Sequence, residues 1–276
     1  METPPPTGAS FRVPALCSAK ISVHGPDQAD GEVVRWEAND GFVLHGYRAR
    51  GYGWVSIPGL ASYRFGAVGD AVAVSDGDAR DADVEDAWYR SVLPLVLQAR
   101  GTQVLHASAV VGRHGVVALC GTSTAGKSTL AWALGERGHT AIADDALPFA
   151  VVDSRTVVRG LAHRIRLRAD VRARHGISQD ASLRDPGEEL RPLAEVVVLV
   201  PDESDSGERL SPVESFTALL PHAYCFALDD LETKAALTDA YLALAQGTPV
   251  TRVAVHDGLD RLDETVDVLE RILDSD

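Results

Sequence analysis

The sequence predicts an α/β protein with a β-rich N-terminal region, and three observations support this prediction. Short apolar runs separated by Gly, Pro, Asp and Asn occupy residues 10–75, a pattern typical of a small antiparallel sheet. From about residue 84 onward, strand-like runs alternate with helix-like stretches, as in α/β domains. Between residues 116 and 134, an apolar run, a glycine-containing loop and a helix-forming stretch follow one another directly.

The N-terminal region is expected to form strands at residues 33–37, 41–46, 53–57 and 71–74, followed by an acidic link at residues 76–82. Asp83 then stands where an N-cap is expected, before an apolar stripe that continues to Leu97. Pro94 lies within this stretch, where proline kinks or divides a helix. We therefore place the domain boundary between residues 83 and 84, with a β-rich region at 1–83 and a second domain at 84–276.

The second domain is expected to contain regular elements over most of its length. Residues 172–189 show neither a helix nor a strand pattern and predict a loop that can close over a bound peptide. Strands are expected at residues 102–111, 115–120, 140–143, 151–152, 156–158, 195–200 and 251–256, an alternating segment at 162–168, and helices at 130–138, 211–221, 229–246 and 261–273.

One stretch fits the pattern G-x-x-x-x-G-K-[ST]. In such loops the backbone N–H groups surround phosphate oxygens, the lysine supplies a positive charge and the hydroxyl binds Mg²⁺. The helix that follows directs its positive dipole end to the same place. The alternative interpretation is an ordinary glycine-rich turn between a strand and a helix. The residues of the loop are Gly121, Thr122, Ser123, Thr124, Ala125, Gly126, Lys127, Ser128 and Thr129.

Lysine is rare in this chain, which makes its position informative. Among 26 basic residues, only Lys20, Lys127 and Lys234 are lysines. A chain that otherwise uses arginine but keeps lysine in this loop favours a compact ammonium over a planar guanidinium. The loop therefore predicts nucleotide or phosphate binding.

Asp144 and Asp145 follow the strand expected at residues 140–143. If that strand runs parallel to residues 116–120, both carboxylates reach the phosphate end of the sheet. One of them is then expected to hold Mg²⁺ with Ser128, and the other to act as a base. The alternative is an aspartate pair that caps a turn. His106, on the preceding strand, is either a buried core histidine or a further site residue.

Residues 105–147 resemble the HPr kinase/phosphorylase family and, more distantly, ATP-dependent phosphoenolpyruvate carboxykinase. The resemblance consists of His106 followed by small residues, Gly115 in a turn, the loop with Lys127 and Ser128, and the later Asp144-Asp145 pair. With its β-rich region before the core, the chain is also similar to the kinases that modify a precursor serine in lasso-peptide pathways. The resemblance implies a P-loop kinase core of the HPr-kinase/phosphoenolpyruvate-carboxykinase type.

The resemblance also implies roles for individual residues. The loop residues 121–129 would bind ATP or another nucleoside triphosphate. Ser128, Asp144 and Asp145 would hold Mg²⁺, with either aspartate as the base, and His106 would lie close to the phosphates. Lys127, Asp144, Asp145 and His106 are thus the expected catalytic residues.

The family's downstream Glu-Ile-Arg-Gly segment has its nearest counterpart here at residues 163–170, which lack that glutamate. Alternation places Arg164, Arg166 and Arg168 on one face, either as a clamp for a phosphate or an acidic substrate, or as a solvated strand face. We expect a serine kinase whose acceptor is a peptide or protein. A small-molecule hydroxyl kinase and a catalytically inactive nucleotide-sensing module remain the alternatives.

Composition limits the remaining possibilities. A net charge of −14 argues against nucleic acid as a partner. No apolar run reaches the ~20 residues needed to cross a bilayer, and the first residues lack a signal-peptide pattern, so we expect no membrane association. The 3 cysteines have no partner motif, which favours a reducing cytoplasm. A homo-oligomer is compatible with the sequence.

Overall fold

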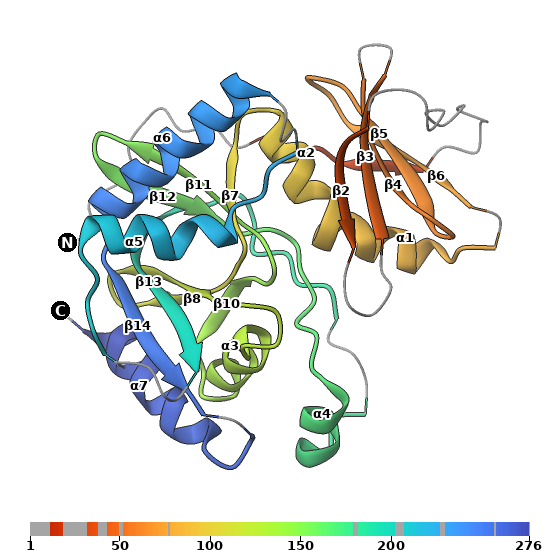
Figure 1. Ribbon diagram of the computed structural model, residues 1–276. Helices are drawn as coiled ribbons and strands as arrows, with labels where there is room; N and C mark the ends of the chain where they lie inside the picture. Colours follow the sequence, from red (N-terminus) through yellow and green to blue (C-terminus); the bar gives the residue numbers. More distant parts are fainter. Residues whose placement is uncertain are drawn as a thin grey trace. The chain divides into compact units, whose positions relative to one another are not determined.

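The computed structural model describes residues 12–18, 32–37, 43–49, 52–76, 78–178, 182–201, 207–226, 230–256 and 258–275 (Figure 1). The chain divides into two compact units. The β-rich unit holds Phe11–Thr102 and Tyr224–Leu237, and the α/β unit holds Gln103–Ala223 and Thr238–Asp276. Of the expected elements, residues 41, 42, 77, 179–181 and 229 lie outside the described ranges.

The β-rich unit contains a sheet with the strand order β1-β6-β5-β4-β3-β2. Neighbouring strands are antiparallel from β2 to β6, which confirms the predicted antiparallel sheet, whereas β1 pairs with β6 in parallel. Strand β5 lies outside the predicted strands, although its buried Ala61, Tyr63 and Phe65 alternate with polar residues. The strands are β1 (Leu16–Ser18), β2 (Glu32–Glu37), β3 (Val43–Ala49), β4 (Tyr52–Ile57), β5 (Ala61–Phe65) and β6 (Ala71–Ser75).

Two helices complete the β-rich unit. Helix α1 (Asp81–Ala87) leads through a π-helical turn (Trp88–Val92) into α2 (Leu93–Ala99). Pro94 stands in the first turn of α2, so the expected helix is divided, as the proline predicts. Asp83 is not the N-cap, because the helix already begins at Asp81 and Asp83 lies in its first turn.

These helices explain why the division of the chain differs from the expected boundary at residue 83. The Tyr63 hydroxyl donates a 2.8 Å hydrogen bond to the Val84 carbonyl, and the Tyr63 ring stacks on Trp88 at 6.1 Å. Both aromatic side chains are fully buried. The helices therefore belong to the β-rich unit, which continues to Thr102.

The described part of the α/β unit is built on an eight-stranded sheet with the order β10-β8-β9-β13-β12-β11-β7, in which β14 also pairs with β13. Strands β9, β13 and β14 are parallel, and β8 lies antiparallel between β9 and β10. The strands are β7 (Gln103–Leu105), β8 (Ala107–Gly112), β9 (Gly115–Cys120), β10 (Thr140–Ala143), β11 (Leu147–Val152), β12 (Arg155–Arg159), β13 (Leu190–Pro201) and β14 (Val250–Val255).

The helices of the α/β unit lie close to their expected positions, with one exception. Helix α4 occupies the start of the segment expected to be a loop. Its ends carry helix signals, with Asp170 in the first turn and Gly176 in a left-handed conformation after the last. The helices are α3 (Lys127–Glu136), α4 (Ala169–His175), α5 (Pro212–Leu219), the 3₁₀ turn Leu220–His222, α6 (Leu231–Gly247) and α7 (Leu262–Asp274).

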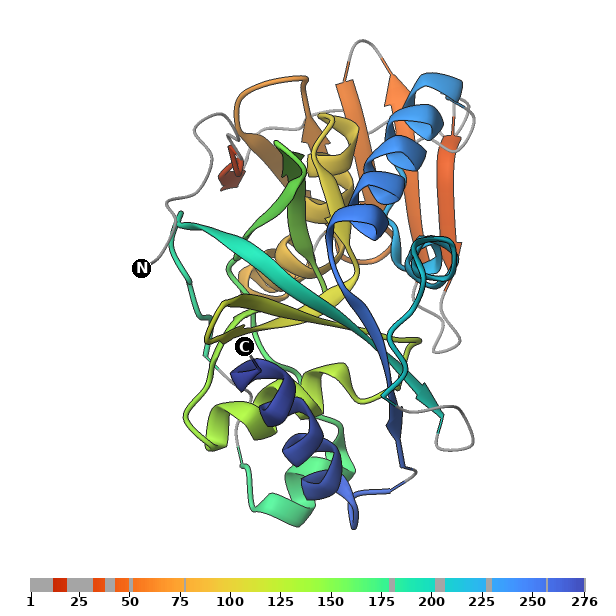
Figure 2. The ribbon, with the colours of Figure 1, turned by 90° about the vertical axis from the view of Figure 1, so that its left-hand side faces the viewer.

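Helices α3 and α7 pack side by side against one face of the strands around β9 (Figure 2). Buried Leu130 and Leu134 of α3 meet Val266 and Leu269 of α7 in the same apolar cluster. This packing fixes α3, and therefore the loop at its N-terminus, against the sheet. No helix among the described residues is both long and apolar enough to cross a membrane.

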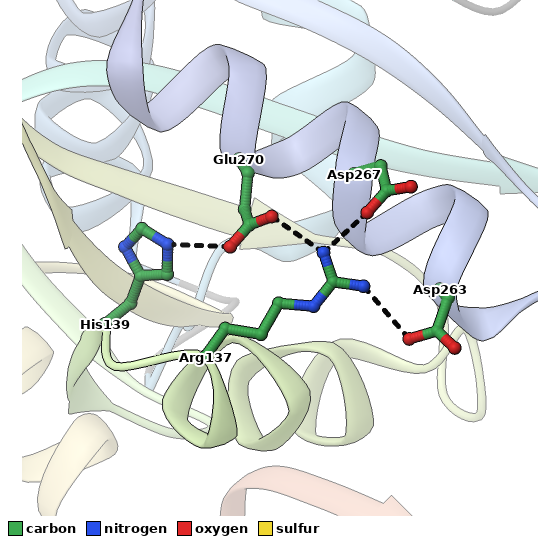
Figure 3. A network of polar contacts seen from close by, with 5 residues as sticks. All are labelled: Arg137, His139, Asp263, Asp267 and Glu270. Atoms are coloured by element: carbon green, nitrogen blue, oxygen red, sulfur yellow. Dashed lines mark hydrogen bonds and ion pairs between the residues drawn. The ribbon is translucent and has the colours of Figure 1, made fainter.

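A polar network joins the outer sides of α3 and α7 (Figure 3). The Arg137 guanidinium contacts Asp263 at 3.0 Å, Asp267 at 2.5 Å and Glu270 at 2.7 Å. His139 reaches the other oxygen of Glu270 at 3.2 Å. Arg137 therefore bridges three carboxylates on α7 and reduces the repulsion among them.

Replacing Arg137 with alanine is expected to lower the free energy of unfolding by about 1 kcal/mol, because one cation serves several carboxylates. Urea denaturation at low salt measures this, and the loss should shrink in 1 M salt because surface charges are screened. Arg261→Ala, which removes an exposed pair with Glu264, is the matched control and should cost less. Equal losses in the two variants would show that the network adds nothing beyond one pair.

Candidate functional site

The glycine-containing loop connects β9 to α3, as the sequence predicts. Gly121 leaves no room for a side chain, because a Cβ there would lie 2.9 Å from the Cβ of Ala125 and 3.2 Å from that of Leu199. Gly126 precedes α3 with a φ of 90°, which glycine adopts without strain. Thr124 has a φ of 73°, an unusual value for a threonine. The loop is therefore a tightly specified turn that ends at a helix N-terminus.

Lys127, the first residue of α3, is 7% exposed. Its ammonium donates hydrogen bonds to the carbonyls of Gly121 at 2.9 Å and Thr122 at 3.3 Å. Burial lowers the pKa of Lys127, and the charges of Asp145, Cys120 and Asp144 oppose this effect. The cation thus lies beneath the loop, close to both carboxylates.

The sheet topology brings three chain segments to this loop. Strands β10 and β9 run in the same direction on either side of the antiparallel β8. The end of β10 and the start of β8 therefore meet the end of β9, where Ala107 pairs with Cys120. The expected strand at residues 102–111 is interrupted at His106, because β7 pairs with β11 whereas β8 pairs with β9 and β10.

Asp144 is 7% exposed, and one of its carboxylate oxygens accepts hydrogen bonds from two hydroxyl groups. Ser108 donates to its Oδ1 at 2.5 Å, and Ser128 donates to the same atom at 2.9 Å. Oδ2 is buried, and no hydrogen-bond partner for it exists among the described residues. Burial and the charge of Asp145 raise the pKa of Asp144 to about 7, although hydrogen bonds from Ser108, Ser128 and the Arg166 backbone act against this.

Asp145 is half-buried and has a φ of 68°, a left-handed conformation that is uncommon outside glycine. Its carbonyl lies 2.8 Å from Nδ1 of His106. Because a carbonyl can only accept, Nδ1 carries the proton and Nε2 is left as an acceptor. Burial and the nearby charge of Lys127 lower the pKa of His106, which favours this neutral form. The structure thus brings together Lys127, Ser128, Asp144, Asp145 and His106.

The predicted arginines lie on an extended segment beside this cluster. Burial alternates along it, with His163 and Ile165 buried, Arg164 half-buried, and Arg166 and Arg168 exposed. Within the described part of the segment no regular strand forms, and it pairs with the chain only through a bridge between His163 and Arg184. The alternation expected at residues 162–168 is therefore present in the burial of the side chains, but not as a regular strand.

The surroundings of the three arginines differ. The backbone N–H of Arg166 reaches Asp144, whereas the guanidinium of Arg168 is paired with Asp170 at 3.1 Å. The segment therefore runs next to the carboxylate pair, with the Arg166 side chain on its outer, exposed side.

Two polar residues of the site were missed by sequence reasoning. Ser108 stands two positions after His106, on the same side of the strand, and this spacing could have identified it. His222 is far away in sequence, and no local pattern marks it. It is 7% exposed, and its carbonyl accepts the 2.7 Å hydrogen bond from the backbone N–H of His106. Burial and the charges of His106 and Lys127 lower the pKa of His222 to about 4.

The lowered pKa of His222 predicts a pH-dependent stability. The unfolded chain takes up this proton near pH 6.5 and the folded chain only near 4, so stability present above pH 6.5 is lost as the pH falls towards 4. The loss should amount to at most about 3 kcal/mol. Urea unfolding at several pH values between 7.5 and 4.5 should show a shallower acid loss in His222→Gln. A matched change at exposed His114 should keep the wild-type profile, and equal slopes in all three proteins would contradict this prediction.

The donor groups around Asp144 fit a magnesium ion. Magnesium prefers oxygen ligands and is usually held by one or two carboxylates together with substrate phosphates and water. Ser128 and the partnerless Oδ2 of Asp144 offer such oxygens, with Asp145 adjacent in the chain. No group of three or more His, Cys, Asp or Glu residues that could hold a metal occurs in the described ranges. The site therefore suits an ion that takes some of its oxygen ligands from the protein and the others from a bound phosphate.

Comparisons with known proteins identify only a distant likeness. No family model matches the sequence, and no curated protein matches it. Among solved structures, the Hpr(Ser) kinase/phosphatase from Coxiella burnetii is similar at a TM-score of 0.38 and 15% sequence identity. The match covers 62% of this chain and 90% of that chain.

Proposed function

We propose that this protein is an ATP- and Mg²⁺-dependent phosphotransferase that transfers a phosphoryl group to a serine hydroxyl of a peptide or protein. The observation that carries the proposal is the cluster at the end of β9. There, a strand–loop–helix with the G-x-x-x-x-G-K-[ST] pattern is joined to the carboxylate pair through the Ser128–Asp144 hydrogen bond. A structural turn would not need a buried lysine and a buried carboxylate next to each other.

The loop and the N-terminus of α3 would bind the phosphates through their backbone N–H groups. The Lys127 ammonium would turn from the loop carbonyls to the phosphates. There it would stabilise the negative charge on the phosphoryl group during transfer. Ser128 and Asp144 would hold Mg²⁺, which would neutralise charge on the phosphate oxygens.

We infer that Asp145 is the base. Asp144 is buried and engaged by Ser108 and Ser128, whereas Asp145 is half-buried and can approach an acceptor. Asp145 would orient the acceptor hydroxyl and take its proton. Neutral His106, whose Nδ1–H donates to the Asp145 carbonyl, would keep Asp145 in its left-handed conformation.

The proposal is tested by incubating the purified protein with ATP, Mg²⁺ and a set of serine-containing peptides, followed by mass spectrometry. Phosphate transfer to a peptide serine, absent in Asp145→Asn, is expected. Transfer only to small hydroxyl compounds would replace the peptide with a small-molecule acceptor. ATP binding without any turnover would identify a nucleotide-sensing module.

Arg166 is proposed to bind an acidic part of the acceptor, since its exposed side chain extends from the segment beside Asp144. Arg166→Glu should raise the KM for the acceptor about tenfold, roughly the loss of one charge-assisted contact, and leave the KM for ATP within about threefold. Arg191→Glu changes another arginine of the same unit that already pairs with an acidic neighbour, Glu189, and serves as the control. A parallel rise in the KM for ATP would make Arg166 a phosphate ligand instead.

A further inference from the structure

A cavity of about 310 Å³ opens beside the loop. Loop residues Thr122 and Gly126 form one wall. The ends of β13 and β14 contribute Leu199 and Val255, and α4 contributes Val171. All these residues belong to the α/β unit.

The walls of this cavity expose polar and apolar surface in about equal amounts, and several of the apolar side chains remain accessible. Ala125, Val255, Leu259 and Leu262 line it and are only half-buried. Apolar side chains that stay partly open around a pocket of a few hundred Å³ are typical of ligand sites. The polar groups of the lining include Thr129 and the ion pair between Arg168 and Asp170, which can orient a ligand.

Helix α4 is held over this side of the sheet by two contacts outside the cavity. Arg174 pairs with Asp260 at 2.6 Å, and the ring of His175 lies edge-on to Trp132 of α3 at 4.7 Å between centroids. The wall formed by α4 is therefore tied both to α3 and to the segment before α7.

The strand order places this cavity and the carboxylate pair on opposite sides of β9. Strands β8 and β10, which end at the Ser108–Asp144 cluster, lie on one side of β9, and β13 and β14 lie on the other. The loop follows β9 and lies between the two. A triphosphate that crosses the loop with its reactive end at Asp144 thus has its other end next to the cavity.

We propose that the cavity binds the nucleoside part of the triphosphate, with the base against Val171, Leu259 and Leu262. This inference rests on the proposed function and adds the direction of the nucleotide: nucleoside towards β13 and β14, terminal phosphate towards β8 and β10. Burial of the base against these apolar side chains adds affinity that a bare phosphate chain lacks.

The test compares the binding of ATP with that of inorganic tripolyphosphate, both with Mg²⁺, by isothermal titration calorimetry. Leu259→Trp fills the cavity and should raise the Kd for ATP at least tenfold, while the Kd for tripolyphosphate stays within threefold. Leu242→Trp, at a partly exposed position on α6 outside the cavity, should change neither value. Val171→Phe fills the cavity from the opposite wall and should reproduce the result.

Each outcome decides the inference. Tripolyphosphate binding also shows that a variant is folded with its loop intact. Unchanged ATP affinity in both filled variants, or equal weakening of the two ligands, would overturn the assignment of the cavity and leave the proposed function standing. A wild-type protein that binds neither ligand would overturn both.

Discussion

Replacing Lys127 with methionine is expected to lower the turnover of ATP at least about 100-fold, as the loss of one preorganised electrostatic group does in other enzymes. Methionine preserves most of the buried stem but removes the ammonium that lies beneath the loop and close to Asp144 and Asp145. Steady-state kinetics with ATP and the acceptor measure the effect. The thermal midpoint should change little, because burying a charge is itself costly and its removal offsets the lost hydrogen bonds.

Lys234→Met is the matched control, since this lysine is exposed on α6. It should retain wild-type turnover. A Lys127→Met protein that is folded and turns over ATP at the wild-type rate would show that the loop is a structural turn.

Asp144→Asn and Asp145→Asn are expected to impair activity in different ways. Loss of the Asp144 carboxylate next to Ser128 should raise the Mg²⁺ concentration needed for half-maximal activity. Loss of the proposed base at Asp145 should lower kcat by about 10²- to 10⁴-fold with ATP affinity unchanged. Titration of Mg²⁺ against activity, together with direct ATP binding, separates the two effects.

The stability of the metal-free protein distinguishes a buried Asp144 carboxyl with a raised pKa from an aspartate that only caps a turn. The pKa of Asp144 is raised to about 7 from an ordinary value of 3.8. The stability that the protonated carboxyl contributes below pH 3.8 is therefore lost as the pH rises through 7. With EDTA present, Asp144→Asn should therefore be more stable than wild type at pH 8 and lose this advantage at pH 4. Identical Mg²⁺ titrations in both variants, or no stability difference at pH 8, would reduce the aspartate pair to a turn.

Much of the fold was predictable because its signals are local. Alternating apolar residues identified most strands, and the Asp170 and Gly176 end signals of α4 were present but outweighed by the polar composition around them. The domain boundary was harder to predict. Its position depends on the hydrogen bond from Tyr63 to Val84 and on the stacking of Tyr63 on Trp88. Tyr63 lies too far from these two residues in the sequence for a local pattern to reveal the contacts.

The sequence by itself determined the loop, because glycines at positions 121 and 126, Lys127 and Ser128 are adjacent in the chain and their spacing sets the local geometry. It also indicated that Asp144, Asp145 and His106 end or begin strands. Only the tertiary structure decided that these residues meet, since this depends on β10 and β9 running in the same direction on either side of β8. The same holds for His222 and for the cavity between β13, β14 and α4, whose parts are distant in sequence and are joined only by strand pairing and burial.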